Sequence, residues 1–377
     1  MDREKLSPQS AVLSPARRLS GIEISLIRQI NALATSESVN LGIGEPNLEP
    51  DETLREMARR AATTDWHYSP NAGHPSLRKR LAADPNEVCV TAGTEEALYA
   101  IFQAYVDPGD EVLVPDPGFL SYTTIAQLCG ATPVPYPLEP PAWQLDAREV
   151  TKRITSKTKL IMINSPSNPL GAVAARDALQ EIANAGPLVV SDEVYREIRY
   201  DDEPPSMRGM SDNVIVVNGM SKSHAMTGLR IGWAIARAEV LKPVITAHQY
   251  IATCASVFSQ ALAENILANE AWNASWLEQV RAQFREQRDT ALFSIERELE
   301  VRIEPPAGAF YAFVPVPLCG SLGFAKTLAT DAAVLVIPGV AFGKRGEGFV
   351  RISYAAPLDR IGSGIERIGR YLRANAR

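Results

Sequence analysis

Short apolar runs alternate with amphipathic stretches from about residue 87 onward. Stretches such as TEEALYAIFQAYV and ARDALQEIANAG have the periodicity of helices. Near-continuous apolar strands that alternate with helices predict a mostly parallel sheet covered on both faces. The predicted strands are EVCVTAG (87–93), EVLVPD (111–116), ATPVPYPL (131–138), TKLIMINSP (158–166), LVVSDEVY (188–195) and NVIVVNGMS (213–221).

Several of these strands end in polar or small residues. Ligands bind at the carboxyl ends of the strands in parallel sheets. We therefore expect Gly93, Asn168, Asp192 and Lys222 to meet along one edge, although they are far apart in the chain.

The pattern changes after residue 270. The stretch NASWLEQVRAQFREQRDTALFSIERELE predicts one long amphipathic helix, and short apolar runs and a basic helix follow it. This order predicts a smaller α/β domain, joined to the larger one through the long helix. The expected division is a flexible arm over 1–16, an N-terminal part of the small domain over 17–44, a large domain over 45–275 and a small C-terminal domain over 276–377.

The composition is that of a soluble globular enzyme, with 46% hydrophobic and 22% charged residues in a chain of 377. A net charge of −6 and the lack of a long basic stripe argue against nucleic acid and anionic membranes as partners. No apolar run approaches the length of a membrane span, and the N-terminus lacks the apolar segment of a secretion signal. We expect a cytoplasmic protein.

The spacing of the metal-binding residue types gives no sign of a metal site. Cys89, Cys129, Cys254 and Cys319 are far apart, so we interpret them as reduced thiols packed as small hydrophobic groups. The four histidines show no metal-ligand spacing either. The segment GIGEPN (42–47) lacks the third glycine of a dinucleotide fingerprint and lies outside the alternating region.

The segment AGTEEAL (92–98) predicts a strand end that turns into a helix. Gly93 would let the backbone approach a ligand closely, and Thr94 would be the N-cap of a helix whose amides bind an anion. A plain capped helix, with Glu95 and Glu96 favouring the helix dipole, is the alternative. For a phosphate to bind there, both acids would have to point away.

Asn168, Asp192 and Tyr195 each have a structural alternative to a functional role. Asn168 could donate to a ligand oxygen or form a turn. Asp192 follows a buried run, so it needs a partner such as a protonated heterocyclic nitrogen, or it caps a helix. Tyr195 lies three residues later, on the same face if a helical turn begins there.

Lys222 follows an apolar strand and has few charged neighbours in sequence. A partly desolvated lysine has a lowered pKa and can act as a nucleophile or a base. A surface lysine whose stem packs on apolar groups is the alternative.

Taken together, these motifs resemble the pyridoxal-phosphate-dependent aminotransferases of fold type I, class I/II. The segment GMSKSHAMTGLRIG satisfies the lysine signature of that family, and the order of the glycine-containing helix start, N-P-x-G, D-x-x-Y, S-K and R-I-S-Y also matches. The resemblance runs from about Leu41 to Tyr354. It implies a large domain with a mostly parallel seven-stranded sheet, the smaller α/β domain, and pyridoxal 5′-phosphate as the cofactor.

The resemblance also implies roles around the cofactor ring. Lys222 would form the Schiff base with the cofactor aldehyde and move the proton, and Asp192 would pair with the ring nitrogen. Tyr195 and Asn168 would donate to the ring O3′. Phe119, in DPGFLSY, would stack on the ring with a face that lacks a polar group.

Further residues are implied for the phosphate. Gly93 and Thr94 would offer backbone amides, and Arg230 would offer a bidentate fork. Tyr68 matches a tyrosine that reaches the phosphate of the partner subunit, so the resemblance implies a homodimer with shared active sites.

For the substrate, Arg351 would bind the α-carboxylate, backed by Asn168 and by the amide of Gly44. The largely apolar segment SGIEISLIRQI (20–30) matches a region that lines the pocket in relatives. It favours neutral or aromatic amino acids.

Two positions depart from the family pattern. Gly219 stands where many members have a phosphate-binding serine, and Ser221 is a possible replacement. Leu170 replaces the common threonine of N-P-T-G.

The predicted function is an aminotransferase that moves the amino group of an L-α-amino acid to a 2-oxo acid. Two alternatives stay open: a β-lyase acting on cysteine conjugates through the same groups, and a non-catalytic regulator that binds pyridoxal phosphate.

Overall fold

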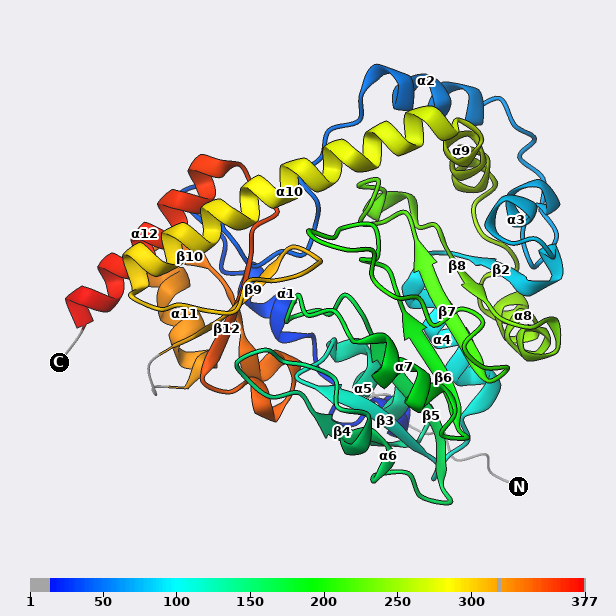
Figure 1. Cartoon of the computed structure of the whole chain (residues 1–377), viewed down its shortest axis with the longest axis horizontal. Coiled ribbons are helices and arrows are strands. Elements are labelled where there is room, and N and C mark those ends of the chain that lie inside the picture. The colour runs from blue at the N-terminus through cyan, green and yellow to red at the C-terminus, as the bar shows by residue number, and fades with distance from the viewer. Residues whose placement is uncertain (1–13, 317–319, 376–377) are drawn as a thin grey trace, which may run out of the picture.

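The computed structural model describes residues 14–316 and 320–375 of the chain. They form a large α/β unit around a seven-stranded sheet and a smaller unit around a three-stranded sheet, with one long helix running past both (Figure 1). The predicted arm over 1–16 lies almost wholly outside the described residues, as does Cys319. The domain boundaries at residues 45 and 276 remain predictions.

The large sheet has the strand order β2-β8-β7-β6-β5-β3-β4. Strand β8 pairs antiparallel with both β2 and β7, while the pairs among β3 to β7 are parallel. The predicted mostly parallel sheet of seven strands is confirmed. Its strands are β2 (Val88–Thr91), β3 (Glu111–Asp116), β4 (Thr132–Pro137), β5 (Thr158–Asn164), β6 (Leu188–Asp192), β7 (Val214–Gly219) and β8 (Gly232–Ile235).

Strand β8 is the one that the hydrophobic pattern did not reveal. It has only four residues, GWAI, and it follows directly on the lysine signature. Its strand character comes from its pairing, because β2 and β7 hold it from both sides.

Alternate side chains of the strands enter two different cores, as the pleat requires. In β7, Val214 and Val216 lie on one face of the sheet, and Ile215 and Val217 lie on the other. The core of Ile215 is covered by α4 (Thr94–Tyr105), α5 (Leu120–Leu128) and α8 (Ala238–Ala252). The core of Val214 includes α6 (Ala147–Thr151) and α7 (Arg176–Ala183) and continues into the smaller unit.

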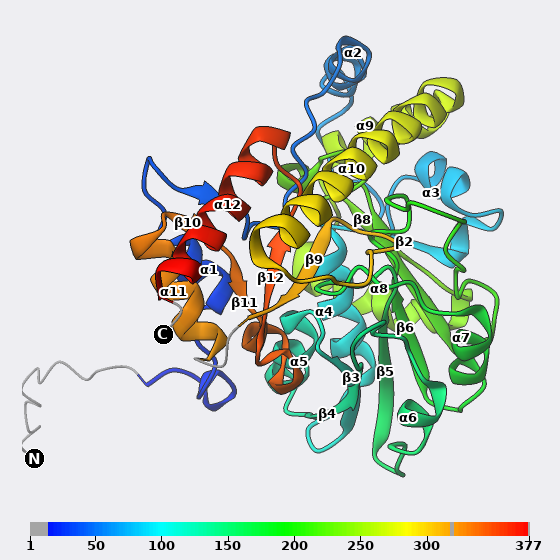
Figure 2. The ribbon, with the colours of Figure 1, turned by 60° about the vertical axis from the view of Figure 1, so that its left-hand side comes forward.

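The smaller unit contains an antiparallel sheet of order β11-β12-β9 and a parallel pair formed by β1 and β10. Helices α1, α11 and α12 gather around these strands (Figure 2). The strands are β1 (Val39–Asn40), β9 (Tyr311–Pro315), β10 (Val334–Leu335), β11 (Ile337–Pro338) and β12 (Phe349–Ser353), and the helices are α1 (Leu26–Asn31), α11 (Ser321–Asp331) and α12 (Leu358–Asn375).

The long helix predicted over 273–300 is α10 (Glu270–Leu299). Its buried residues follow one stripe that includes Trp276, Val280, Phe284 and Ala291, as expected for an amphipathic helix. At 1.5 Å per residue it spans about 45 Å. It packs on α12 at one end and near α9 (Val257–Ala268) at the other, where α2 (Glu52–Ala61) and α3 (Pro75–Leu81) also lie (Figure 1).

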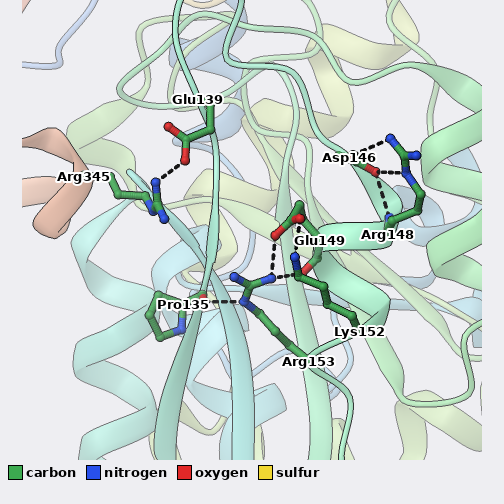
Figure 3. A network of polar contacts seen from close by, with 8 residues as sticks. All are labelled: Pro135, Glu139, Asp146, Arg148, Glu149, Lys152, Arg153 and Arg345. Carbon is green, nitrogen blue, oxygen red and sulfur yellow. Dashed lines mark hydrogen bonds and ion pairs between the residues drawn. The ribbon is translucent and has the colours of Figure 1, made fainter.

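The two units also meet beside the ends of β3 and β4. Arg345 of the smaller unit forms an ion pair with Glu139, close to a cluster of surface ion pairs around Glu149 (Figure 3). The backbone amide of Arg345 donates to Asp116 at 3.1 Å, and the amide of Gly118 donates to the carbonyl of Phe342 at 2.7 Å. These contacts hold the segment after β11 against the end of β3.

No helix among the described residues combines the length and the apolar character that a membrane crossing requires. Within the same residues, no cluster of histidine, cysteine and acidic side chains could hold a metal ion.

Candidate active site

A cavity of about 870 Å³, a volume that includes open solvent at its mouth, lies at the carboxyl ends of β5, β6 and β7. Its lining confirms that the sheet brings distant strand ends together. Ile27, from the predicted pocket segment 20–30, also lines it. The lining includes ten of the residues predicted for the site: Gly44, Thr94, Phe119, Asn168, Asp192, Tyr195, Ser221, Lys222, Arg230 and Arg351.

Lys222 reaches the cavity from the turn after β7. Its Nζ donates to the backbone carbonyl of Gly44 at 2.7 Å. Burial, followed by the charge of Arg351, lowers the pKa of the lysine to about 8. The lysine therefore faces the cavity and not the outer surface, so the alternative of a surface lysine is wrong.

Asp192 is the last residue of β6 and is buried. Its Oδ2 accepts a hydrogen bond from the hydroxyl of Tyr122 at 2.8 Å, and its Oδ1 accepts from the amide of Val194 at 3.2 Å. Burial raises the pKa of the carboxyl to about 6. Asp192 begins a short turn instead of capping a helix, and its carboxylate lines the cavity.

Sequence reasoning missed Tyr122. It lies on α5, three residues after the N-cap Phe119, so both aromatic rings lie on the same side of that helix, with centroids 5.6 Å apart. The spacing of three residues in the sequence could have indicated that Tyr122 lies near the ring predicted to stack on the cofactor.

Arg351 comes from β12, and its side chain is fully buried. Its Nη1 donates to Asn168 Oδ1 at 2.8 Å and its Nη2 to the carbonyl of Gly42 at 2.6 Å, so both partners are neutral. Its Nε finds no partner among the described residues. Burial lowers the pKa of this guanidinium. A buried cation with neutral partners and an unused donor fits an anionic ligand.

Tyr195 is buried and lines the cavity, and its hydroxyl lies 2.8 Å from that of Tyr311. Tyr311, the first residue of β9, also lines the cavity and was missed by sequence reasoning. Nothing in its local sequence, PAGAFYAF, distinguishes it from a core aromatic residue.

Arg230 lies against the start of α4. A Cβ added to Gly93 would come within 2.5 Å of Arg230 Nη2, so a larger residue at position 93 would displace the guanidinium. Gly93 also has a φ of +85°. Arg230 Nη1 donates to the carbonyl of Thr227 at 2.9 Å. The close approach predicted for Gly93 therefore involves an arginine side chain.

Two details of the predicted anion site are wrong. The N-cap of α4 is Gly93, not Thr94, and no side chain caps the helix. The amide of Gly93 donates to the carbonyl of Thr91 at 2.8 Å, because the positive φ closes a tight turn, so this amide is not offered to a ligand. The amide of Thr94, in the first turn of the helix, has no partner among the described residues.

The two acids at this helix start behave differently. Glu96 turns away, because its Oε2 accepts from the amide of Ala92 at 3.1 Å and its Oε1 lies 2.9 Å from His248 Nδ1. Glu95 lines the cavity, against the expectation that both acids would avoid it.

The departures from the family pattern have spatial reasons. A Cβ at Gly219 would lie 2.8 Å from the carbonyl oxygen of Ile231 and 2.9 Å from the Cα of Gly232, so β8 leaves no room for a serine. Ser221 is buried and lines the cavity. Leu170 packs in the hydrophobic core.

The structure does not bring Tyr68 to the cavity. Its side chain is 85% exposed, and two further aromatic residues, Trp66 and Tyr250, are more than 80% exposed as well.

Comparisons with known proteins agree with this geometry. Residues 36–368 match the family model described as aminotransferase class I and II. An aspartate aminotransferase of Pyrococcus horikoshii is 34% identical, with 95% of this chain and 97% of that protein covered. An aromatic-amino-acid aminotransferase of Thermococcus litoralis is also 34% identical, over 94% of this chain and 97% of that protein.

Among solved structures, the aspartate aminotransferase of Thermus thermophilus with maleate superposes with a TM-score of 0.90 at 32% identity, covering 95% of this chain and 99% of that one. The match extends over both units of the fold. The chain belongs to the class I and II aminotransferases, enzymes of fold type I that use pyridoxal phosphate to move an amino group from an amino acid to a 2-oxo acid.

Proposed function

We propose that this cavity binds pyridoxal 5′-phosphate at Lys222 and transfers the amino group of a neutral L-α-amino acid to a 2-oxo acid. The observation that carries the proposal is the burial of Arg351 in the same cavity as Lys222 and Asp192, with hydrogen-bond partners that are all neutral among the described residues. This arrangement provides an amine, a carboxylate and a separate binding group for the substrate carboxylate.

The residues of the cavity fit this cofactor. The guanidinium of Arg230 and the amides in the first turn of α4 suit a phosphate. Glu95 lines the same cavity, so Arg230 would also have to offset the charge of this carboxylate. The buried carboxylate of Asp192 suits a protonated ring nitrogen, since the ion pair would relieve the cost of its burial. Phe119 offers an aromatic face, and Tyr195 and Asn168 offer donors to a ring oxygen.

We assign two tasks to Lys222: holding the cofactor and moving the substrate proton. The bound cofactor would supply an electron sink that makes the α-proton of an amino acid acidic. With a pKa of about 8, roughly a tenth of the lysine is neutral at pH 7, so its Nζ can accept that proton. The same nitrogen can return the proton as a general acid.

Arg351 would bind the substrate carboxylate and so orient the substrate. Its unused Nε and the neighbouring side chain of Asn168 provide donors at one place in the cavity. Fixing the carboxylate determines which bond at Cα faces Lys222, which favours loss of the proton over loss of carbon dioxide.

The cavity wall supports a neutral substrate side chain. Its cations among the described residues are Lys222, Arg230 and Arg351, and each has a proposed role already. A second carboxylate on the substrate would find no further cation among the described residues of the lining. The aromatic specificity in the name of the Thermococcus litoralis relative is compatible with this class.

We also propose a homodimer in which Tyr68 completes the site of the partner. The exposure of Tyr68, Trp66 and Tyr250 supports this, because the burial of large aromatic side chains in an interface stabilises the association. The cytoplasm remains the proposed location, since the widely spaced cysteines suit a reducing compartment.

The test is spectroscopic. Purified protein loaded with pyridoxal phosphate should show a visible absorbance that a neutral L-amino acid bleaches and a 2-oxo acid restores. Lys222→Ala should lose the covalent label that borohydride reduction leaves on the wild-type protein. If the variant keeps that label on the protein, the assignment of Lys222 is wrong.

A panel of amino acids compares the substrate classes and the lyase alternative. Phenylalanine or leucine should bleach the absorbance at lower concentration than aspartate does. If aspartate is the better donor, the proposed neutral class is wrong. Release of pyruvate and ammonia from a cysteine conjugate, without bleaching by any amino acid, would support the β-lyase.

A further inference from the structure

Tyr311 contacts two of the proposed functional groups at once. Its hydroxyl lies 2.8 Å from the hydroxyl of Tyr195, and its ring lies under the guanidinium of Arg351, with 4.4 Å from the arginine Cζ to the ring centroid. It is 1% exposed and lines the cavity. Tyr195 faces the cofactor in the proposed function, and Arg351 faces the substrate.

The hydroxyl of Tyr311 is held in one place. A Cβ added to Gly44 would come within 2.4 Å of it, so the backbone of Gly44 lies directly against the hydroxyl. Within the described residues, its hydrogen-bond partner is the hydroxyl of Tyr195. The hydroxyl is therefore fixed between a backbone segment and a single phenol.

The ring of Tyr311 is equally constrained. The guanidinium of Arg351 also lies 4.9 Å from the ring centroid of Phe342, so it sits against two aromatic rings. A cation on an aromatic face is stabilised most where water is excluded, and Arg351 is buried. The two rings thus hold the arginine, and its Nε has no partner in the part of the chain that the structure describes, so it can donate to a ligand.

We propose that Tyr311 is a positioning residue that joins the substrate clamp to the cofactor-facing phenol: its hydroxyl orients the hydrogen of Tyr195 toward the cavity, and its ring holds Arg351. The proposal rests on the roles proposed above for Tyr195 and Arg351.

The direction of the hydrogen bond follows from the role proposed for Tyr195. The two hydroxyls lie 2.8 Å apart, a geometry that allows either of them to donate. Because Tyr195 is proposed to give its hydrogen to a cofactor oxygen, it accepts in this pair and Tyr311 donates. Tyr195 has one hydrogen, which is then free to point into the cavity at a cofactor oxygen.

The hydroxyl is tested with Tyr311→Phe in the enzyme loaded with pyridoxal phosphate. The readout is the pH midpoint of the visible absorbance of the cofactor, which a purely structural residue would not move. Weakening the Tyr195 donor disfavours the deprotonated ring oxygen, so the midpoint should rise by about half to one pH unit, the effect expected for one hydrogen bond. An unchanged midpoint overturns the proposal.

The variant Tyr195→Phe shows whether an unchanged midpoint in Tyr311→Phe contradicts only the role of Tyr311 or also the proposed role of Tyr195. It should raise the midpoint at least as far as Tyr311→Phe does. If Tyr195→Phe moves nothing, the role of Tyr195 is wrong. If Tyr195→Phe shifts the midpoint and Tyr311→Phe does not, the inference alone is wrong. The double variant should match Tyr195→Phe, because Tyr311 acts through Tyr195; additive shifts would contradict that.

The ring is tested by comparing Tyr311→Phe with Tyr311→Leu. Phenylalanine keeps the aromatic face, so KM for the best amino donor should stay within about twofold of the wild type. Leucine removes the face, and KM should rise by about three- to tenfold, with a smaller change in kcat. Equal KM values for the two variants, at similar melting temperatures, would contradict the proposed role of the ring in holding Arg351.

Discussion

Three glycines meet where β7 and β8 pass beside the start of α4. A Cβ at Gly232 would lie 2.7 Å from the backbone of Gly93 and Thr94, and one at Gly219 would lie 2.9 Å from the Cα of Gly232. Each glycine lets two backbones approach more closely than side chains allow. This packing brings the amide end of α4 to the same place as Arg230. The missing serine at position 219 is therefore a consequence of backbone packing.

Gly219→Ala tests this reading. The added methyl would press on the carbonyl of Ile231, so we expect a loss of stability of about 1–3 kcal/mol, as for other overpacked sites. Denaturant unfolding measures the change. Gly323→Ala is the matched control, because Gly323 lies in α11 with open space around it, and alanine there should stabilise by up to about 1 kcal/mol. If the two variants behave alike, the packing argument is wrong.

At the scale of elements, α10 does more than connect the two units. Trp276 Nε1 donates to the carbonyl of Ser223 at 3.0 Å, next to Lys222. The ring of His224 stacks on Trp276, and its Nε2 lies 2.9 Å from Asn273 Oδ1. The helix therefore fixes the backbone that carries the lysine. His224 is buried, and burial lowers its pKa from 6.5 to about 4.

This burial predicts a loss of stability in acid. Between pH 6.5 and 4 the unfolded chain binds a proton at this histidine and the folded chain does not, so stability falls as the pH is lowered through that range. The loss from this group should be about 2 kcal/mol between pH 7.5 and pH 5.

His224→Phe keeps a ring against Trp276 and removes the titration. The drop in denaturation midpoint between pH 7.5 and pH 5 should be smaller in this variant than in the wild type. His67, whose side chain is 92% exposed, gives the control His67→Asn, which should keep the full drop. An equal drop in all three proteins would mean that His224 titrates normally.

At the scale of the whole molecule, the active site lies between two units that meet at several points. The substrate clamp Arg351 belongs to the smaller unit, and Lys222 and Asp192 belong to the larger one. The Arg345–Glu139 ion pair joins the units near the end of β3 (Figure 3). The amide of Gly118, which donates to the carbonyl of Phe342, joins them there as well. Their relative position therefore sets the distance between substrate clamp and lysine.

In the proposed dimer, the partner subunit also contributes a residue to the active site, and mixing two variants can test this. Lys222→Ala and Tyr68→Ala should each lose most of their activity. If Tyr68 acts in the partner site, refolding the two together creates heterodimers with one intact site each, and about a quarter of all sites become native. If Tyr68 acts within its own subunit, the mixture should stay as inactive as its components.

The chemistry of the site could be predicted from the sequence to a large extent. Lys222, Asp192, Asn168 and Arg351 belong to short motifs whose residue types carry the reaction, and the alternation of strands and helices places such motifs at one sheet edge. The fold class follows from this alternation, whereas the cofactor and the reaction follow from the resemblance to a known family that these motifs carry. These motifs could be identified in the sequence because each one lies within a few consecutive residues.

Other features were decided by tertiary contacts alone. Tyr311 resembles a core aromatic residue in sequence, and the spacing of Tyr122 from Phe119 indicates a shared helix face but no partner. Only the folded chain places the hydroxyl of Tyr122 on Asp192 and that of Tyr311 on Tyr195. The reason for Gly219 lies in β8, and the divergence of Glu95 from Glu96 depends on His248, 152 residues away. Local sequence specifies which groups are present, whereas the distances between groups from different elements arise only when the sheet, the helices and the smaller unit pack together.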